Sequence, residues 1–244
     1  AASDVYKRQA QASTLELPDA SWPDMARFAF ARELIVRPGG VFPKYGAVDR
    51  DYVGNEYDGF QDTFTSSLYA NLEWGRFDQA RAVLDNYLSD YTQPDGLVNM
   101  RGPETGQFGL TLSLLARYLR YTGDVALLRK HQGKIEATAQ LLVELHDASL
   151  QLPRDDRGHG LIHGWSESDA CLYPDPSLWW KPYFGNSALA IRGWEDIAAV
   201  WTAIAGAPGR SSQWRQRARQ LRQRLLESIR ADIRLSLIHI SEPT

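Results

Sequence analysis

The sequence predicts an all-α fold of helical hairpins, and three observations lead to that prediction. Strand-like alternation of apolar and polar residues is absent. Helix-like segments that are apolar nearly all round alternate with segments that carry one apolar stripe. Tight turns alternate with long loops between these segments. A helix that is apolar on all sides is buried, and a striped one faces water. Each unit is therefore expected to be a buried helix, a tight turn, an exposed helix and a long loop.

A first helix is predicted over residues 22–36, and three hairpins are predicted after it. Pro23 in its first turn and Pro38 beyond its end agree with the residue preferences of helix termini. The hairpins are expected at 63–91, 107–145 and 187–230, with turns at Gly75, at 122–124 (TGD) and at 206–210 (GAPGR). The first helix is then the outer helix of an earlier hairpin.

The contrast between buried and exposed helices is clearest in the last two hairpins. Residues 107–121 and 187–205 are apolar around most of the helix. Their partners carry single stripes, made of Leu128, Ile135, Ala139 and Leu142 in one and of Trp214, Ala218, Leu221 and Leu225 in the other. The Arg-rich run at 210–234 is therefore interpreted as a solvated helix face rather than as a basic binding tract.

Both ends of the chain are interpreted as non-native. Residues 1–9 (AASDVYKRQ) and 235–244 (LSLIHISEPT) match translations of the adapter used in preparing sequencing libraries, and such segments are left out of fold reasoning. The native part is then expected to be a partial domain at 10–234, open at both ends. The alternative is an ordinary N-terminal tail and a short C-terminal apolar strand.

The composition narrows the classes of partner. The net charge of −3 gives no reason to expect nucleic acid or an anionic membrane as a partner, and no apolar run approaches the ~18 residues of a membrane span. The single cysteine, Cys171, excludes a disulfide framework and a multi-cysteine metal site. The 8 Trp and 11 Tyr are the strongest signal, because aromatic side chains stack on sugar rings or fill a large core.

Residues 158–186 (GHGLIHGWSESDACLYPDPSLWWKPYFGN) are predicted to form the floor of an active-site cleft. A loop of this length is usually functional or disordered, and its many aromatic residues exclude disorder. Glu167 and Asp169 lie in the middle of it, just after His163 and Trp165. A carboxyl group among aromatic side chains is desolvated, and a neighbouring anion raises its pKa further, so either residue is suited to act as a general acid. The alternative is that one of them caps the backbone of a tight loop.

Four stretches of the chain resemble the six-hairpin (α/α)6 glycosidase superfamily, and in particular its trehalase-like and glucosidase-like members. They are YDGFQD at 57–62, FDQARAVLDNYL at 77–88, YTGD at 121–124 and GLIHGWSESD at 160–169. The resemblance covers residues 20–230. It implies an (α/α)6 toroid of helical hairpins, present here as about half to two-thirds of the ring. From the loops alone, an open solenoid and a closed ring both remain possible, and loops converging on one end favour a ring with a central cleft.

The resemblance also implies an activity, the hydrolysis of a glycosidic bond with inversion. Such hydrolysis needs a protonated carboxyl group and a second carboxylate on the opposite face of the sugar. Trehalases carry a motif of the form GL…ES…D whose Asp is the acid. Here Asp169 follows Glu167-Ser168 directly, whereas trehalases insert residues before the Asp, so either Glu167 or Asp169 is expected to be the acid. The base would come from a later hairpin, beyond residue 234.

The remaining candidate site residues are expected to bind the carbohydrate substrate. They are Tyr57, Asp58, Gln61, Asp62, Arg101, Glu104, His163, Trp165, Trp179, Trp180 and Tyr183. Each has a structural alternative: Asp62 and Asn186 are also suited to cap the helices that follow them, and Arg101 and Glu104 to form a surface salt bridge. Trp179, Trp180 and Tyr183 are equally suited to plug the top of the ring as core.

Other chemistries fit the sequence less well. His159, His163 and Glu167 have metal-ligand spacing only on a helix, and Gly158, Gly160 and Gly164 argue against one, so neither a metal nor another cofactor is expected. Two further functions remain open. One is a non-catalytic carbohydrate-binding toroid. The other is a glycoside phosphorylase, which would need a phosphate pocket outside these residues.

Overall fold

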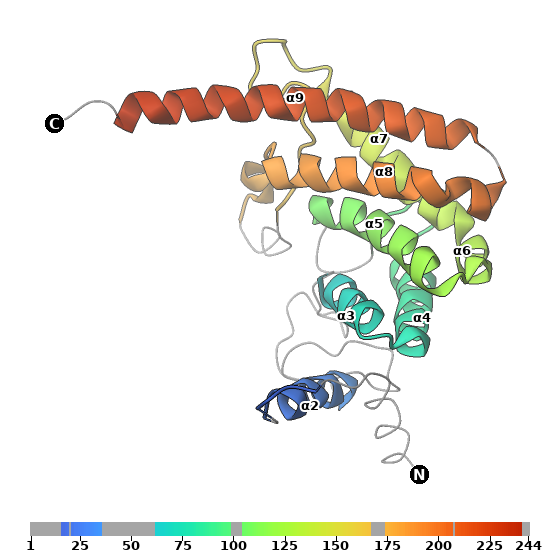
Figure 1. Cartoon of the computed structure of the whole chain (residues 1–244). Helices are drawn as coiled ribbons and strands as arrows, with labels where there is room; N and C mark the ends of the chain where they lie inside the picture. The colour runs from blue at the N-terminus through green and yellow to red at the C-terminus, as the bar shows by residue number, and fades with distance from the viewer. Residues whose placement is uncertain are drawn as a thin grey trace.

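Helices make up the fold in the computed structural model, which describes residues 16–19, 21–35, 62–98, 104–166, 174–206 and 208–240 (Figure 1). The helices are α2 (Ser21–Ile35), α3 (Asp62–Glu73), α4 (Phe77–Asn86), α5 (Thr105–Thr122), α6 (Val125–Lys130), α7 (Gln132–Ser149), α8 (Phe184–Ala205) and α9 (Gly209–Ile240). A π-helical turn, η2 (Tyr87–Tyr91), extends α4, and a 3-10 turn, η4 (Pro176–Trp179), precedes α8. Within the described ranges, extended pairing is limited to isolated bridges, which confirms the all-α prediction there.

Helices α3, α5 and α8 form an inner row whose N-terminal ends lie on the same side of the molecule (Figure 1). Helix α5 packs between α3 and α8, and α9 packs on the outer side of α8. Helix α7 contacts α5, α8 and α9. The predicted order of a more buried helix, a turn and a more exposed helix is present in the second and third hairpins, whereas α3 and α4 of the first are each buried along one face.

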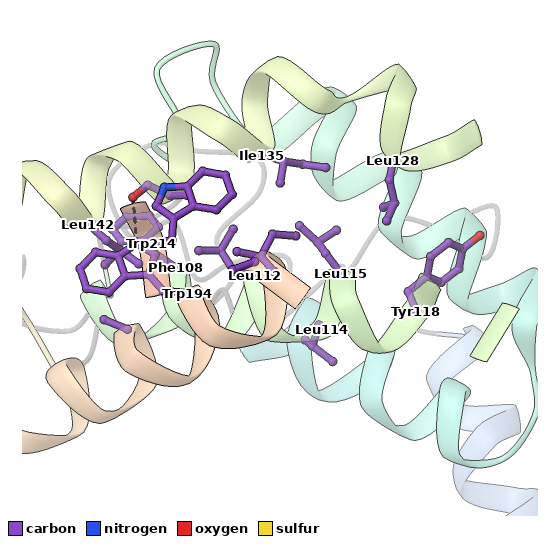
Figure 2. Close-up of a cluster of buried hydrophobic side chains, with 14 of the residues drawn as sticks. Phe108, Leu112, Leu114, Leu115, Tyr118, Leu128, Ile135, Leu142, Trp194 and Trp214 are labelled. Atoms are coloured by element: carbon purple, nitrogen blue, oxygen red, sulfur yellow. Dashed lines mark hydrogen bonds between the residues drawn. The ribbon is translucent and has the colours of Figure 1, made fainter. Parts of the chain in front are cut away.

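The core lies between the inner row and the outer helices. Figure 2 shows side chains from α5 to α9 filling this space, among them Phe108, Leu112, Ile135, Trp194 and Trp214. Burying one such side chain contributes about 1.5–3 kcal/mol. The indole N–H of Trp194 donates to the Ala139 carbonyl at 3.1 Å, so this large side chain is buried without an unpaired donor.

Glycines in the left-handed conformation make the predicted hairpin turns. Gly75, Gly123 and Gly206 have φ of 68°, 68° and 70°. Gly123 and Gly206 end α5 and α8, and each donates its backbone N–H to the carbonyl four residues earlier. Residues with a Cβ rarely adopt this conformation, so the glycines fix where each inner helix stops and the outer one begins.

The expectation of one helix over the outer part of the second hairpin is wrong. His131 interrupts it, with φ −108° and ψ 14°, and separates α6 from α7. Its imidazole lies 2.6 Å from the Asp85 carboxylate on α4, which also accepts from Lys130. Leu127 and Leu128 of α6 are both buried in the core.

The inner helices α5 and α8 approach each other closely through two glycines. A Cβ on Gly109 would lie 2.2 Å from the Leu189 carbonyl oxygen, and one on Gly193 would lie 2.4 Å from the Gly109 carbonyl oxygen. Backbone therefore meets backbone at this crossing. The crossing brings the first turns of the two helices side by side, and the candidate site lies there.

Helix α2 and the end of α9 are the two terminal elements of the described chain. Helix α2 contacts the first hairpin through Phe30, whose ring meets that of Trp74 edge-on at 5.2 Å and lies 4.4 Å from the Arg76 guanidinium. Helix α9 continues to Ile240, through part of the segment predicted to be adapter-derived, and residues 1–9 lie outside the described part. Of the helices that are described, none combines the length and apolar character needed to cross a bilayer.

Candidate functional site

Buried polar side chains gather at the end of the molecule where the inner helices begin. This polar end consists of Thr65 on α3, Glu104, Thr105 and Thr111 at the start of α5, and Asn186 and Ser187 at the start of α8, all of them buried. Polar groups taken out of water need partners, so a concentration of them usually indicates a binding or catalytic role or a dense hydrogen-bond network.

Glu104 occupies the position before the first turn of α5. Its side chain is only 5 % exposed. Its backbone forms a parallel bridge with Trp165, and the Thr105 N–H donates to the Trp165 carbonyl at 3.2 Å. Glu104 is therefore buried where the 158–166 loop meets α5, and its pairing with Arg101 lies outside the described residues. A carboxylate here is favoured by the positive end of the helix dipole.

Tyr87 lies beneath Glu104. Its hydroxyl is 3.3 Å from the Thr111 hydroxyl. The pKa of Tyr87 is raised to about 12, mainly by burial and to a smaller extent by the negative charge of Glu104, while the hydrogen bond with Thr111 acts in the opposite direction. Tyr87 therefore stays a neutral hydrogen-bonding group at ordinary pH. It borders a cavity of about 10 Å³ together with Thr65, Thr111 and apolar neighbours, close to the space that one water needs.

The 158–166 loop is fitted closely to the inner helices. A Cβ on Gly164 would lie 1.7 Å from the Thr105 hydroxyl, so only glycine allows this approach. Gly164 also exchanges two backbone hydrogen bonds with Lys181, at 3.0 and 3.3 Å. The Ile162 N–H donates to the Ser187 hydroxyl at 3.0 Å. The loop is therefore held against the first turns of both α5 and α8.

An aromatic rim, defined as Trp165, Trp179 and Trp180, borders this loop. The Trp165 indole N–H donates to the Pro176 carbonyl at 3.0 Å, and its ring meets that of Trp180 edge-on at 6.2 Å. Trp179 and Trp180 are 41 % and 38 % exposed. Both indoles therefore offer free surface in this chain, and whether a complete ring would cover them stays a prediction. Asp175, which accepts from the Ser177 N–H at 3.1 Å, caps the 3-10 turn that holds them at the surface.

His163, Tyr183 and Asn186 lie around the same loop. The His163 Nδ1 is 3.0 Å from the Leu161 carbonyl, and the ring is half-buried beside Gly158. Tyr183 is half-buried and precedes α8. The expectation that Asn186 caps this helix is wrong, because α8 begins two residues earlier, after the extended backbone of Tyr183.

Several predicted site residues lie outside the described residues. These are Tyr57, Asp58, Gln61, Arg101, Glu167 and Asp169. Asp62 is the first residue of α3, and its side chain also lies outside the described part. The roles of Glu167 or Asp169 as general acid therefore stay predictions. Ser166, the residue before Glu167, follows the rim residue Trp165.

The described residues offer no group of three or more His, Cys, Asp or Glu side chains that could hold a metal ion. His159 and His163 lie in irregular backbone, as the glycines around them predict. The Nδ1 of His159 is 2.9 Å from the Leu152 carbonyl, while that of His163 is near Leu161. Each ring is thus tied to its own part of the loop.

Sequence reasoning missed three residues that hold the loop, namely Thr105, Ser187 and Arg224. Thr105 and Ser187 act at the starts of inner helices, where a small polar residue is too common to single out. Arg224 belongs to the arginines of α9, and nothing in their spacing separates it from the others. Their roles arise from contacts with a loop far away in the sequence.

Comparison of the chain with models of known protein families, with curated proteins and with solved structures found no significant match. What the chain does therefore has to follow from its fold and from the residues of this site.

Proposed function

We propose that this chain is part of a glycoside hydrolase of the (α/α)6-toroid type. Helical hairpins would close into a ring, and the glycosidic bond would be cleaved at the end where the inner helices begin. Three features support the proposal: the second and third hairpins pair a more buried with a more exposed helix, the inner helices begin on the same side, and the 158–166 loop lies against that end.

The observation that carries the proposal is the aromatic rim beside the buried Glu104. A sugar ring has apolar faces and a polar edge of hydroxyl groups, so its sites combine flat aromatic surfaces with a few fixed polar groups. Trp179 and Trp180 offer exposed indole surface. Within the rim, Trp165 contacts the Trp180 ring, and its backbone forms a bridge with Glu104. Trp165 therefore connects the exposed indoles to the buried carboxylate.

The chemistry proposed for this site is acid–base hydrolysis with inversion. Glu167 or Asp169 would protonate the glycosidic oxygen as the bond to the anomeric carbon breaks. A carboxylate from a later hairpin would remove a proton from the water that attacks the opposite face. Burial among aromatic side chains would keep the acid protonated at neutral pH, which this role requires.

Hydrolysis by the full-length protein tests the proposal. A panel of α- and β-linked glucosides and other glycans would be assayed, and the best substrate used for kinetics. Glu167→Gln or Asp169→Asn should lower kcat by about 10²–10⁴-fold, the usual contribution of a general acid. Glycan affinity measured by calorimetry should change little, because an amide keeps the shape of the carboxyl group.

The matched control is Glu227→Gln, on the exposed side of α9, where the carboxylate accepts only from the Gln223 amide at 3.0 Å among the described residues. It should leave kcat unchanged. If the Glu167 variant and the Asp169 variant both turn over substrate as fast as the wild type, the general acid does not lie in this loop. That result would contradict the proposal.

A second candidate function is carbohydrate binding without catalysis, and the exposure of Trp179 and Trp180 favours it, since exposed aromatic surface alone can bind a glycan. The same assays separate the two. Glycan binding that is lost in Trp179→Ala or Trp180→Ala, with no hydrolysis of any substrate by the wild type, would favour the binding function. Cleavage that requires added inorganic phosphate would instead indicate a phosphorylase.

A further inference from the structure

One side chain from the outer layer of helices reaches the loop that leads to the predicted acids. Arg224 lies on α9, and its Nε donates to the His159 carbonyl at 2.6 Å. One of its terminal nitrogens approaches the Arg157 carbonyl at 3.4 Å. The guanidinium therefore holds the backbone at the start of the 158–166 loop. A hydrogen bond from a charged donor is shorter and stronger than one between neutral groups.

The backbone under Arg224 is shaped to receive this side chain. Gly160 has φ of +71°, a conformation that residues with a Cβ rarely adopt. A Cβ there would also lie 3.2 Å from the Arg224 Cγ, so the aliphatic part of the arginine packs directly over the glycine. The contact thus combines hydrogen bonds to carbonyls with close packing of the arginine stem.

The loop has further hydrogen bonds to α7 and to the inner helices, and on α7 the Ser149 carbonyl accepts from the Gly160 N–H at 3.3 Å. The Ser187 hydroxyl on α8 accepts from the Ile162 N–H at 3.0 Å, and the Trp165 carbonyl accepts from the Thr105 N–H of α5 at 3.2 Å. Arg224 and α7 therefore hold the first part of the loop from the outer layer, while α5 and α8 hold its second part from inside. The first part has no inner-helix hydrogen bond of this kind among the described residues.

Three other arginines of α9 pair with carboxylates, and Arg215 donates to the Ala198 carbonyl within α8. Arg210, Arg217 and Arg222 pair with Glu136 on α7, Asp147 on α7 and Glu195 on α8. Such pairs join helix to helix on the surface, where each contributes little. Arg224 instead uses backbone carbonyls of the loop, so its contact fixes the path of the loop rather than the packing of two helices.

We propose that Arg224 is a positioning residue for the active-site loop. By holding residues 157–160 against α9, it sets the angle at which the chain enters the close contact of Gly164 with Thr105. It thereby sets the place of Trp165, from which the chain continues to the predicted acids. This inference rests on the proposed function, because it assigns Arg224 to the reaction of that same site.

The first test is kinetic and uses the full-length protein. Arg224→Gln removes the charge and shortens the side chain, so the loop should lose its contact with α9 and keep only the Gly160–Ser149 hydrogen bond to the outer layer. We expect kcat to fall about 10–100-fold while KM changes less than about 3-fold, since misplacement of about 1 Å costs the reaction far more than it costs binding. Arg224→Lys keeps the charge and one donor and should recover part of kcat.

The second test follows the loop itself and does not depend on activity. Amide hydrogen exchange at Gly160, Leu161 and Ile162 should become at least about 10-fold faster in Arg224→Gln, while exchange in α5 and α8 stays the same. The matched control is Arg222→Gln, two residues away on α9, which loses only the pair with Glu195. It should change neither the loop exchange nor kcat.

The outcomes separate this inference from the proposed function. Unchanged loop exchange in Arg224→Gln, or faster exchange with wild-type kcat, overturns the positioning role while hydrolysis by the wild type still stands. Equal losses in Arg222→Gln and Arg224→Gln also overturn it, because a general effect of α9 would then explain both. If the wild type hydrolyses no glycan, the proposed function fails, and the positioning role fails with it even where the exchange data show a loop contact.

Discussion

His146 shows at the scale of one residue how burial makes stability depend on pH. It is 2 % exposed on α7, and its ring lies 6.2 Å from that of Trp194. Burial, together with the positive charge of Arg217, lowers the pKa of His146 from 6.5 to about 4. The imidazole is therefore neutral in the folded protein under conditions in which the unfolded chain already binds a proton.

The sign of the effect follows from this difference in proton binding. Stability from the neutral His146 is fully present above pH 6.5 and is lost as the pH falls from 6.5 toward 4, because protons then favour the unfolded state. The difference amounts to about 3 kcal/mol. Urea unfolding at several pH values should show a shallower decline in His146→Gln than in the wild type. Parallel curves for the two proteins would show that another group causes the decline.

Glu104 shows why single site residues are hard to place from sequence. The loop around it predicts a sugar ligand or a surface ion pair equally well, because both use an exposed carboxylate. Its burial comes from a bridge to Trp165, about sixty residues further along the chain. For Trp179 and Trp180, the sequence fits a sugar-stacking surface and a core equally well, and their exposure in this chain follows from a 3-10 turn that Asp175 caps.

At the scale of elements, the close crossing of α5 and α8 makes a direct prediction. Gly109→Ala would place a methyl group 2.2 Å from the Leu189 carbonyl oxygen, and the backbones would have to move apart. Overpacking of this kind costs about 1–3 kcal/mol or more. The control is Gly133→Ala on α7, where a methyl group would meet nothing within 4 Å. It should stabilise the protein by about 0.5–1 kcal/mol, because alanine favours the helix.

Thermal or urea unfolding of the two variants decides this prediction. Opposite shifts in the unfolding midpoint, down for Gly109→Ala and up for Gly133→Ala, would agree with the crossing described. If Gly109→Ala is neutral or stabilising, α5 and α8 do not approach as closely as the structure describes.

Most elements could be predicted from local pattern. The stripe of Trp214, Ala218, Leu221 and Leu225 on α9 is buried as the spacing predicts, because a 3.6-residue period puts these side chains on one face. The break at His131 could not be predicted, since it depends on Asp85, 46 residues earlier in the chain. Local periodicity carries no information about such a partner.

At the scale of the whole molecule, the structure contains three helical hairpins, and their closure into a ring stays a prediction. An open array and a closed ring share the same local contacts, and they differ only in how the first and last hairpins meet. The inner helices α3, α5 and α8 begin on one side, and this orientation suits a ring with a site at that end (Figure 1). The sequence pattern of buried and exposed helices predicts the hairpins but cannot choose between these two closures.

The central claim is that acids from the 158–186 loop act on a glycan at the end where the inner helices begin. A crystal structure of the full-length protein with a bound oligosaccharide tests it most directly. We predict that a carboxyl oxygen of Glu167 or Asp169 lies about 3 Å from a glycosidic oxygen, with a second carboxylate about 6.5–9.5 Å away. A sugar ring should lie against Trp179 or Trp180. A glycan bound elsewhere, or both carboxylates directed into solvent away from the start of α5, would contradict the account.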